Sequence, residues 1–275
     1  MKVKVHGLAQ QGFRLAIIAS TTVAAALLRK ATGRIDGFVV EGHSAGGHNA
    51  PPRGRPQTSA EGEPLYGRRD EPDLAALAAL GLPFWLAGSF GRPESIDTAR
   101  RLGAVGVQVG TAFAYCEESG LAPELKAKVL ALSTRGEARV FTDPLASPTG
   151  FPFKVVQLPG TLSDPDVYER RTRTCDLGYL RHAYCRPDGT LGWRCPGEPV
   201  DDYERKGGES QETVGRKCVC NGLMANIGLG QIMNNGECEP ALVTSGDDVA
   251  TVAQFLAPGA HSYSASDVIR HLIGA

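Results

Sequence analysis

A histidine that follows two consecutive glycines is the first group in this sequence suited to chemistry. Residues 41–48 read E-G-H-S-A-G-G-H and come directly after a short apolar run. Gly46 and Gly47 allow a tight turn and a close approach of the backbone to a ligand. The imidazole of His48 can take up or release a proton near neutral pH, as a general base must. A glycine turn beside a surface histidine would give the same pattern, so the motif needs support from elsewhere in the chain.

Two further glycine-rich turns follow later apolar runs. Residues 87–91 read A-G-S-F-G, and residues 106–113 read G-V-Q-V-G-T-A-F. Free backbone N–H groups in such turns attract anions, and the last two strands of (β/α)8 barrels build a phosphate site in this way. Ordinary turns between strands and helices also favour Gly and Ser. The three segments together therefore indicate a phosphate site that none of them establishes singly.

Alternating strands and helices must position these turns. The expected strands cover residues 14–20, 37–41, 83–87 and 106–109, and the expected helices cover residues 21–30, 73–80 and 94–102. Ser20 or Thr21 can cap the first helix, and Pro93 suits the first turn of the third. This rhythm predicts βαβ units and a parallel sheet. The long loop over residues 49–69, rich in Pro, Gly and charge, is typical of a functional lid or a disordered segment.

The rhythm changes after about residue 120. We expect a helix at 122–132, strands at 139–142 and 154–158, and little periodicity at 175–238. Residues 244–248 read as a helix start with 249–256 behind it, and Ser264 with Asp267 forms a capping pattern for a helix over 268–273.

Six of the seven cysteines fall between residues 175 and 238. Thiolates at this density can hold zinc or an iron–sulfur cluster, although the spacing fits no standard template. Buried thiols that pack as small apolar groups are the alternative, and for the isolated Cys116 a packed core position is favoured over a redox role. The candidate metal ligands are Cys175, Cys185, Cys195, Cys218 and Cys220, with His182 as a further possible member.

The charge balance gives no reason to expect a nucleic acid or a membrane as partner. The chain has 29 basic and 30 acidic side chains and a formal charge of −1. No apolar stretch reaches the roughly 20 residues of a membrane span. The first 30 residues superficially resemble a signal peptide, but the apolar run is broken by Ser20, Thr21 and Thr22, and a capped helix explains it better. We therefore expect a cytoplasmic protein.

The ordered motifs resemble those of the nitronate monooxygenase (2-nitropropane dioxygenase) family. They are E-G-H-S-A-G-G-H, P-F-W-L-A-G-S-F-G and G-V-Q-V-G-T-A-F-A-Y-C-E-E-S, and the match covers roughly residues 14–120. The motifs are also similar to those of FMN-dependent enoyl-acyl-carrier-protein reductases. The resemblance implies an FMN-binding (β/α)8 barrel with His48 as the base that acts at the substrate α-carbon. The implied cofactor-binding residues are Gly46 and Gly47 at the flavin, Gly88 and Ser89 on the seventh strand, Gly110 and Thr111 on the eighth, and Gln108 just before them.

The resemblance also implies that part of the barrel is absent from this chain. By family order, residues 14–20 would be the fifth strand. The expected fold is thus α/β, with the C-terminal half (strands 5–8) of a TIM barrel at 1–150 and a cysteine-rich α+β extension at 151–275. Ser89 also stands where relatives commonly have a second glycine. Half a barrel leaves two open sheet edges, so we expect a partner chain or a homo-oligomer to complete it.

The implied activity is oxidation of an alkyl nitronate, or a similar carbon acid, by FMN and O2. The first alternative is an enoyl-thioester reductase that uses FMN and a nicotinamide donor. The second, of a different class, is an inactive fragment or a metal-binding interaction module.

Overall fold

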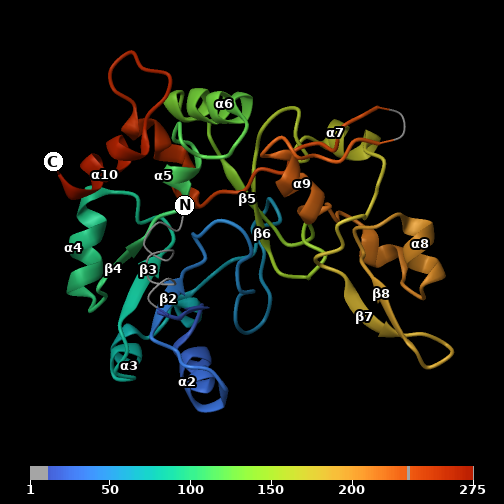
Figure 1. Ribbon diagram of the computed structural model, residues 1–275, viewed down its shortest axis with the longest axis horizontal. Helices are drawn as coiled ribbons and strands as arrows, with labels where there is room; N and C mark the ends of the chain where they lie inside the picture. Colours follow the sequence, from blue (N-terminus) through green and yellow to red (C-terminus); the bar gives the residue numbers. More distant parts are fainter. Residues whose placement is uncertain (1–11, 234–235, 275) are drawn as a thin grey trace.

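A four-stranded parallel sheet forms the N-terminal half of the molecule. The computed structural model describes residues 12–233 and 236–274, so the first 11 residues of the segment that resembles a signal peptide lie outside the description. The strands pair in chain order, each parallel to the next (Figure 1). This confirms the predicted parallel α/β arrangement. The strands are β1 (Leu15–Ile18), β2 (Gly37–Glu41), β3 (Phe84–Ala87) and β4 (Gly106–Gln108).

Helices between the strands cover the sheet, as the alternation predicts. Ser20 caps the first of them, because its hydroxyl accepts from the Val23 N–H at 3.2 Å. Phe38 and Phe84 from the sheet pack against Leu77, and all three are almost fully buried. The helices are α2 (Thr21–Lys30), α3 (Leu74–Ala78), α4 (Pro93–Arg101) and the short α5 (Thr111–Ala114).

A two-stranded antiparallel sheet follows the helix α6 (Pro123–Thr134). Its strands are β5 (Val140–Asp143) and β6 (Phe153–Val156). The start of β6 also pairs with the loop after β2, through a bridge between Phe153 and His48. Residue 150 lies in the connection between these paired strands, and the domain division at that point stays a prediction.

The cysteine-rich region has more regular structure than its sequence indicated. It contains the hairpin of β7 (His182–Cys185) and β8 (Leu191–Arg194), which extends from the body in Figure 1. Asp188-Gly189 lies at the turn of this hairpin and is a known hairpin signal, so the expected lack of regular structure at 175–238 is wrong here. The helices around the hairpin are α7 (Pro165–Arg170), α8 (Val200–Arg205), η2 (Ser210–Thr213) and α9 (Val219–Ala225).

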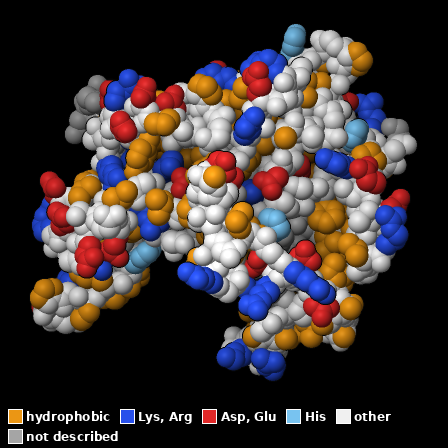
Figure 2. All heavy atoms as spheres, turned by 180° about the vertical axis from the view of Figure 1, so that it is seen from behind, with side chains coloured by type: hydrophobic (Ala, Val, Ile, Leu, Met, Phe, Trp, Pro, Cys, Tyr) orange, Lys and Arg blue, Asp and Glu red, His pale blue; other side chains and the backbone are white. Residues whose placement is uncertain are grey.

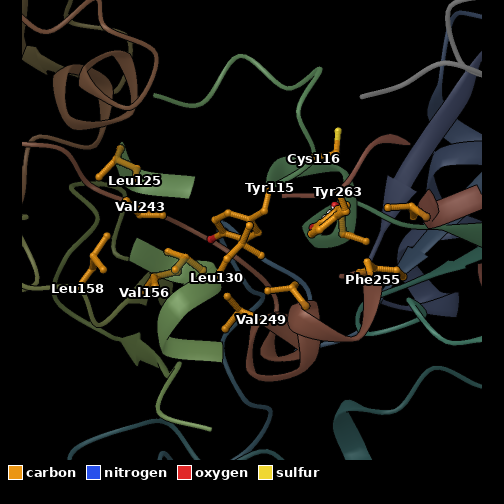
Figure 3. Close-up of a cluster of buried hydrophobic side chains, with 14 of the residues drawn as sticks. Tyr115, Cys116, Leu125, Leu130, Val156, Leu158, Val243, Val249, Phe255 and Tyr263 are labelled. Carbon is orange, nitrogen blue, oxygen red and sulfur yellow. Dashed lines mark hydrogen bonds between the residues drawn. The ribbon is translucent and has the colours of Figure 1, made fainter. Parts of the chain in front are cut away.

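The C-terminal segment returns to the parallel sheet. It forms η3 (Asp247–Phe255), which is a 3-10 helix although the sequence suggested an ordinary one, and α10 (Ala265–Ile273) with the predicted Ser264–Asp267 capping box. Side chains from η3 and α10 pack with those of α5 and α6 in one buried cluster (Figure 3). Chain segments more than a hundred residues apart therefore share a core.

No helix in the described part of the chain is long and apolar enough to cross a membrane. Basic and acidic side chains are interspersed over the face shown in Figure 2, in keeping with the near-zero formal charge of the sequence. This face offers no extended single-sign field that would attract a polyanion.

Candidate functional site

A cavity of about 300 Å³ lies at the carboxyl ends of β2, β3 and β4. Parallel strands end at the same edge of a sheet, which is where ligands bind in α/β proteins. The structure thus brings the three glycine-rich turns to one place. Six of the seven residues predicted to bind cofactor line this cavity: Gly46, Gly88, Ser89, Gln108, Gly110 and Thr111.

The turn after β3 holds an unusual backbone. Gly88 has φ +100° and Ser89 has φ 56°, and Ser89 is the only residue other than glycine with positive φ in the described segments. Such a conformation is strained for a residue with a side chain, and it is concentrated at functional sites. The Ser89 hydroxyl is also buried without a hydrogen-bond partner. A buried donor of this kind inside a cavity is a group that a ligand oxygen would satisfy.

The turn after β4 leaves space beside its backbone. A Cβ atom added at Gly110 would meet no atom within 4 Å, so it would project into open cavity space. The next residue, Thr111, is buried, and its hydroxyl accepts from the Gly246 N–H at 3.0 Å. Thr111 therefore joins the β4 turn to a distant segment as well as lining the cavity.

That distant segment, residues 244–246, forms a wall that the sequence analysis missed. The Thr244 hydroxyl accepts from the Gly47 N–H at 2.8 Å, and Ser245 shares a 2.5 Å hydrogen bond with Tyr115. A Cβ atom at Gly46 would lie 2.7 Å from the Ser245 carbonyl carbon, so the close packing here requires glycine. The available signal was a fourth apolar run followed by a Gly-containing turn, A-L-V-T-S-G at 241–246.

Asp248 places a carboxyl group at the same cavity. One of its oxygens, Oδ1, is buried and has no hydrogen-bond partner. Burial is the main cause that raises the pKa of this group, and a hydrogen bond with Thr111 opposes the rise. Burial therefore shifts the balance toward the neutral acid, and the neutral form can donate a hydrogen bond to an anion.

His48 lines a second cavity, of about 200 Å³, which shares Glu41 with the first. The imidazole Nε2 makes a 2.6 Å hydrogen bond with the hydroxyl of Ser147, a fully buried residue. The ring also meets Phe153 edge-on at 4.8 Å between centroids. Burial lowers the pKa of His48 below 6.5, so the ring is neutral, and able to act as a base, at neutral pH.

The loop that carries Ser147 is held rigidly. Asp143 accepts hydrogen bonds from the Leu145 and Ala146 N–H groups, and Arg216 donates to the Ser147 carbonyl. The Ser147 hydroxyl also contacts the Thr149 hydroxyl at 2.8 Å. These bonds fix the group that orients His48. No local pattern could predict this partner, because Ser147 lies 99 residues from His48 in the chain.

The long loop at 49–69 forms one side of the histidine cavity. Tyr66 stacks on His43 with ring centroids 4.5 Å apart. Burial, assisted by nearby Asp70 and Asp247, raises the pKa of Tyr66 to about 12, and its hydroxyl is buried without a partner. Arg53 from the same loop also lines this cavity. The loop is ordered and forms part of the cavity wall, so the disordered alternative is wrong, and a functional role for the loop stays a prediction.

Glu41 and Gln108 stand where the two cavities meet. The Gln108 amide donates to the Glu41 carboxylate over 3.3 Å, and Glu41 lines both cavities. Gly47, the seventh predicted cofactor residue, lines neither; it has φ +84° and directs its N–H to Thr244. Its role in this structure is to turn the backbone.

A cofactor phosphate fits the first cavity. The unpaired Ser89 hydroxyl supplies a donor, the Gly110 turn leaves open space, and a neutral Asp248 can add a second donor. The Asp248 carboxylate would oppose the phosphate charge if it formed, so the fit depends on its protonation.

The candidate metal ligands do not form a metal site. Within residues 12–233 and 236–274, no group of three or more His, Cys, Asp or Glu side chains is arranged to hold a metal ion. Cys185 is exposed on the β7–β8 hairpin, and Cys116 is buried in the main core.

Comparisons with known proteins point to one family. The nitronate monooxygenase family profile matches residues 2–142. A probable nitronate monooxygenase from Bacillus subtilis (strain 168) is 39% identical over 111 residues, which are 40% of this chain and 30% of that protein.

Two solved structures are similar at lower identity. FabK from Thermotoga maritima has a TM-score of 0.49 at 16% identity, over 98% of this chain and 62% of its own. A nitroalkane oxidase from Streptomyces ansochromogenes has a TM-score of 0.47 at 18% identity, over 95% of this chain and 56% of its own. The chain spans less than two thirds of each of these relatives.

Proposed function

The chain belongs to the nitronate monooxygenase family, whose profile matches more than half of it, and on this premise we propose that it is part of an FMN-dependent oxidoreductase that oxidises alkyl nitronates with O2. The observation that carries the proposal is the pair of adjacent cavities. One has the features of a phosphate site, and the other contains a neutral histidine with a fixed orientation.

In this proposal the first cavity holds the FMN phosphate. Ser89 and the backbone around Gly88, Gly110 and Thr111 would bind it, with Gly46 allowing the wall at 244–246 to close on the site. Gln108 and Glu41, at the junction of the cavities, would face the flavin end of the cofactor. Bound FMN would supply the redox chemistry, taking electrons from the substrate and passing them to O2.

His48 would handle the proton of the substrate. With Nε2–H donating to the Ser147 hydroxyl, Nδ1 would have the lone pair that accepts a proton from the substrate α-carbon. The lowered pKa keeps that nitrogen free to accept a proton at neutral pH. His43 and Tyr66, which stack on each other, line the same cavity as His48.

We also propose that the sheet is half of a (β/α)8 barrel. Strands paired in chain order, each parallel to the next, are the arrangement of such a barrel, whereas doubly wound sheets reverse their strand order. In the described sheet β1 and β4 are the edge strands. The remaining strands of such a barrel would complete the flavin site.

A charge placed in the phosphate cavity tests the proposal. Gly110→Glu puts a side chain and a negative charge into the space beside Gly110, so the protein should lose bound flavin. Gly120→Glu is the matched control, because Gly120 is exposed and leaves room for a side chain. Each protein is incubated with FMN and then dialysed, and the flavin absorbance that remains with the protein is measured. Equal flavin retention by both variants would rule out the assigned phosphate site.

Substrate assays separate the two redox functions. Turnover of an alkyl nitronate in air supports the proposal, and turnover of an enoyl thioester with NAD(P)H would favour the reductase alternative. The absence of flavin binding under all conditions would leave the non-enzymatic alternative.

A further inference from the structure

The cavity that contains His48 is lined by two side chains that the proposed proton transfer does not use. Arg53 and Tyr66 both belong to the long loop at 49–69, and neither lines the cavity assigned to the FMN phosphate. Both side chains are hydrogen-bond donors. What each of them contacts within the protein decides whether it remains free to bind a ligand.

The hydroxyl of Tyr66 is a buried donor that has no hydrogen-bond partner among the described residues. The Tyr66 ring is held by its stacking on His43, with an angle of 9° between the ring planes. Burial raises the pKa of Tyr66 to about 12, so the hydroxyl keeps its proton at neutral pH. Because unpaired buried polar groups are rare in native proteins, this donor indicates a ligand that supplies the missing acceptor.

Arg53 is a cation that takes part in none of the ion pairs of the described chain. Its guanidinium donates to the Arg69 carbonyl at 2.7 Å and to the Ala19 carbonyl at 3.3 Å. These two bonds fix the guanidinium at the cavity, which Ala19 also lines. A guanidinium has five N–H donors, and Arg53 is exposed, so donors remain for a ligand that enters from solvent.

The two carboxylates that line this cavity are already engaged in hydrogen bonds. One oxygen of Asp70 accepts from the Arg53 backbone N–H at 2.7 Å, and the other accepts from the Gly67 N–H at 2.8 Å. Glu41 accepts from the Gln108 amide at 3.3 Å. Donors that bond a carboxylate stabilise its negative charge, so these groups leave the Arg53 charge uncompensated by a direct ion pair.

We propose that Arg53 and Tyr66 form an oxyanion-binding pair, which holds the negatively charged oxygens of the substrate while His48 acts at its α-carbon. This inference rests on the proposed function, in which the substrate is an anionic carbon acid. A nitronate group is planar, and its two oxygens share one negative charge. It can therefore accept hydrogen bonds from the planar guanidinium of Arg53 and from the Tyr66 hydroxyl together.

Binding of nitrate to the full chain without flavin tests the pair directly, because nitrate is an unreactive planar anion with oxygens arranged like those of a nitronate. Isothermal titration calorimetry should show binding that Arg53→Met and Tyr66→Phe each weaken by about tenfold or more, since hydrogen bonds to a charged group are the stronger ones. Arg55→Met is the matched control, because it removes the same charge from an exposed position of the same loop outside the cavity lining. Tyr179→Phe, at an exposed tyrosine, is the control for the hydroxyl.

Tyr66→Phe separates ligand binding from a structural role. The variant keeps the ring that stacks on His43 and removes only a hydroxyl without a partner, so its thermal unfolding should match that of the unmodified chain while its nitrate affinity falls. Both control variants should bind nitrate as the unmodified chain does. Absence of nitrate binding by the unmodified chain, or equal affinity of each variant and its control, would overturn the proposal.

Steady-state kinetics with an alkyl nitronate distinguish failure of this pair from failure of the proposed function. In flavin-loaded protein, Arg53→Met and Tyr66→Phe should raise the KM for the nitronate about tenfold and change kcat less, the mark of lost substrate binding. Flavin retention should stay unchanged, since neither residue lines the phosphate cavity. Normal turnover with an unchanged KM in both variants would overturn the pair and leave the proposed function standing. Nitrate binding that depends on Arg53 and Tyr66 in a chain that never retains flavin would support the pair and reject the proposed function.

Discussion

His48 shows how a single contact defines the chemistry of a residue. Its ring is open to a cavity on one side, while Nε2 is held by the buried Ser147 hydroxyl and the ring edge by Phe153. In the proposed role Nε2–H donates to the Ser147 hydroxyl, and Nδ1 then has the lone pair that can accept a proton from a ligand. The orientation and the protonation state of His48 are therefore set by the protein before any substrate binds.

Removing this imidazole should abolish proton transfer and leave cofactor binding intact. We expect His48→Ala to retain flavin but to lose about 100-fold or more in turnover, the usual contribution of a general base. In the unmodified protein kcat/KM should rise with pH through a midpoint below 6.5, since the neutral ring is the base and burial lowers its pKa.

The pH profile of kcat/KM tests whether His48 is the general base. The acid limb should be missing in His48→Ala and present in His182→Ala, which alters an exposed histidine on the β7–β8 hairpin. If His48→Ala keeps both its turnover and its acid limb, another group is the base.

Because the carboxyl group of Asp248 lies at the phosphate cavity, we expect cofactor retention to depend on pH. Burial raises its pKa above 3.8, so the carboxyl is neutral at low pH and ionises beside the phosphate as pH rises. The affinity for flavin should therefore fall as the pH rises through the raised pKa of Asp248, which lies above 3.8. Asp248→Asn removes the charge and should tighten FMN binding at alkaline pH by about fivefold or more. The reason is that two like charges 4 Å apart repel each other by about 1 kcal/mol even in water.

The measurement is an FMN titration of both proteins across the pH range. The Asn variant should show a flatter profile, with little difference from the parent at the acidic end. Identical slopes for the two proteins would mean that Asp248 stays neutral or lies away from the bound phosphate.

At the scale of elements, a buried lysine ties β6 to the start of η3. Lys154 is almost fully buried within β6, and its ammonium group contacts the Asp247 carboxylate at 2.6 Å and the Thr142 hydroxyl at 3.0 Å. Asp247 also donates its N–H to the Ser44 carbonyl. This contact holds the wall at 244–246 against the turn that carries Gly46.

Breaking the pair from the Asp247 side should destabilise the fold more than removing both partners. Asp247→Ala leaves the Lys154 ammonium group buried with only the Thr142 hydroxyl as its named partner. This should lower the free energy of unfolding by about 1–3 kcal/mol. The double variant Lys154→Met/Asp247→Ala removes the buried charge and should recover much of this loss. Denaturant unfolding of the three proteins measures the difference. A double variant that is no more stable than Asp247→Ala would show that the buried charge is not the cause.

At the scale of the whole molecule, the C-terminal segment closes the structure. Val249 and Phe255 of η3 and Tyr263 pack with Tyr115 and Leu130 of the central segment, as Figure 3 shows. Tyr263 donates its hydroxyl to the Ala112 carbonyl at 2.6 Å. This shared core positions the wall at 244–246, so global stability and cofactor binding should be linked.

A large-to-small change in that core tests the link. Phe255→Ala should cost about 3–5 kcal/mol through lost burial and a cavity, and it should weaken flavin retention because the adjacent wall loosens. Ile269→Ala on α10 is the control, because that side chain is half-exposed. Thermal unfolding and flavin absorbance are measured together. Retention that is unchanged in a clearly destabilised Phe255→Ala protein would separate the core from the site.

The sequence by itself determined the local features of this protein. Hydrophobic runs, the Ser20 cap and the Ser264–Asp267 box depend on residues close together in the chain, so the strands of the parallel sheet and the helices α2, α4, α6 and α10 were predicted near their observed bounds. The glycine-rich turns were placed at strand ends for the same reason. The hairpin of the cysteine-rich region was missed although its turn carries a local signal.

Only the tertiary structure decided which distant groups complete each site. Ser147 lies 99 residues from His48 and Thr244 lies 197 residues from Gly47. Such contacts follow from how the elements pack in three dimensions, and neither periodicity nor capping encodes that packing. The protonation preferences of His48 and Asp248 also depend on the tertiary structure, because burial is the main cause that shifts their pKa values.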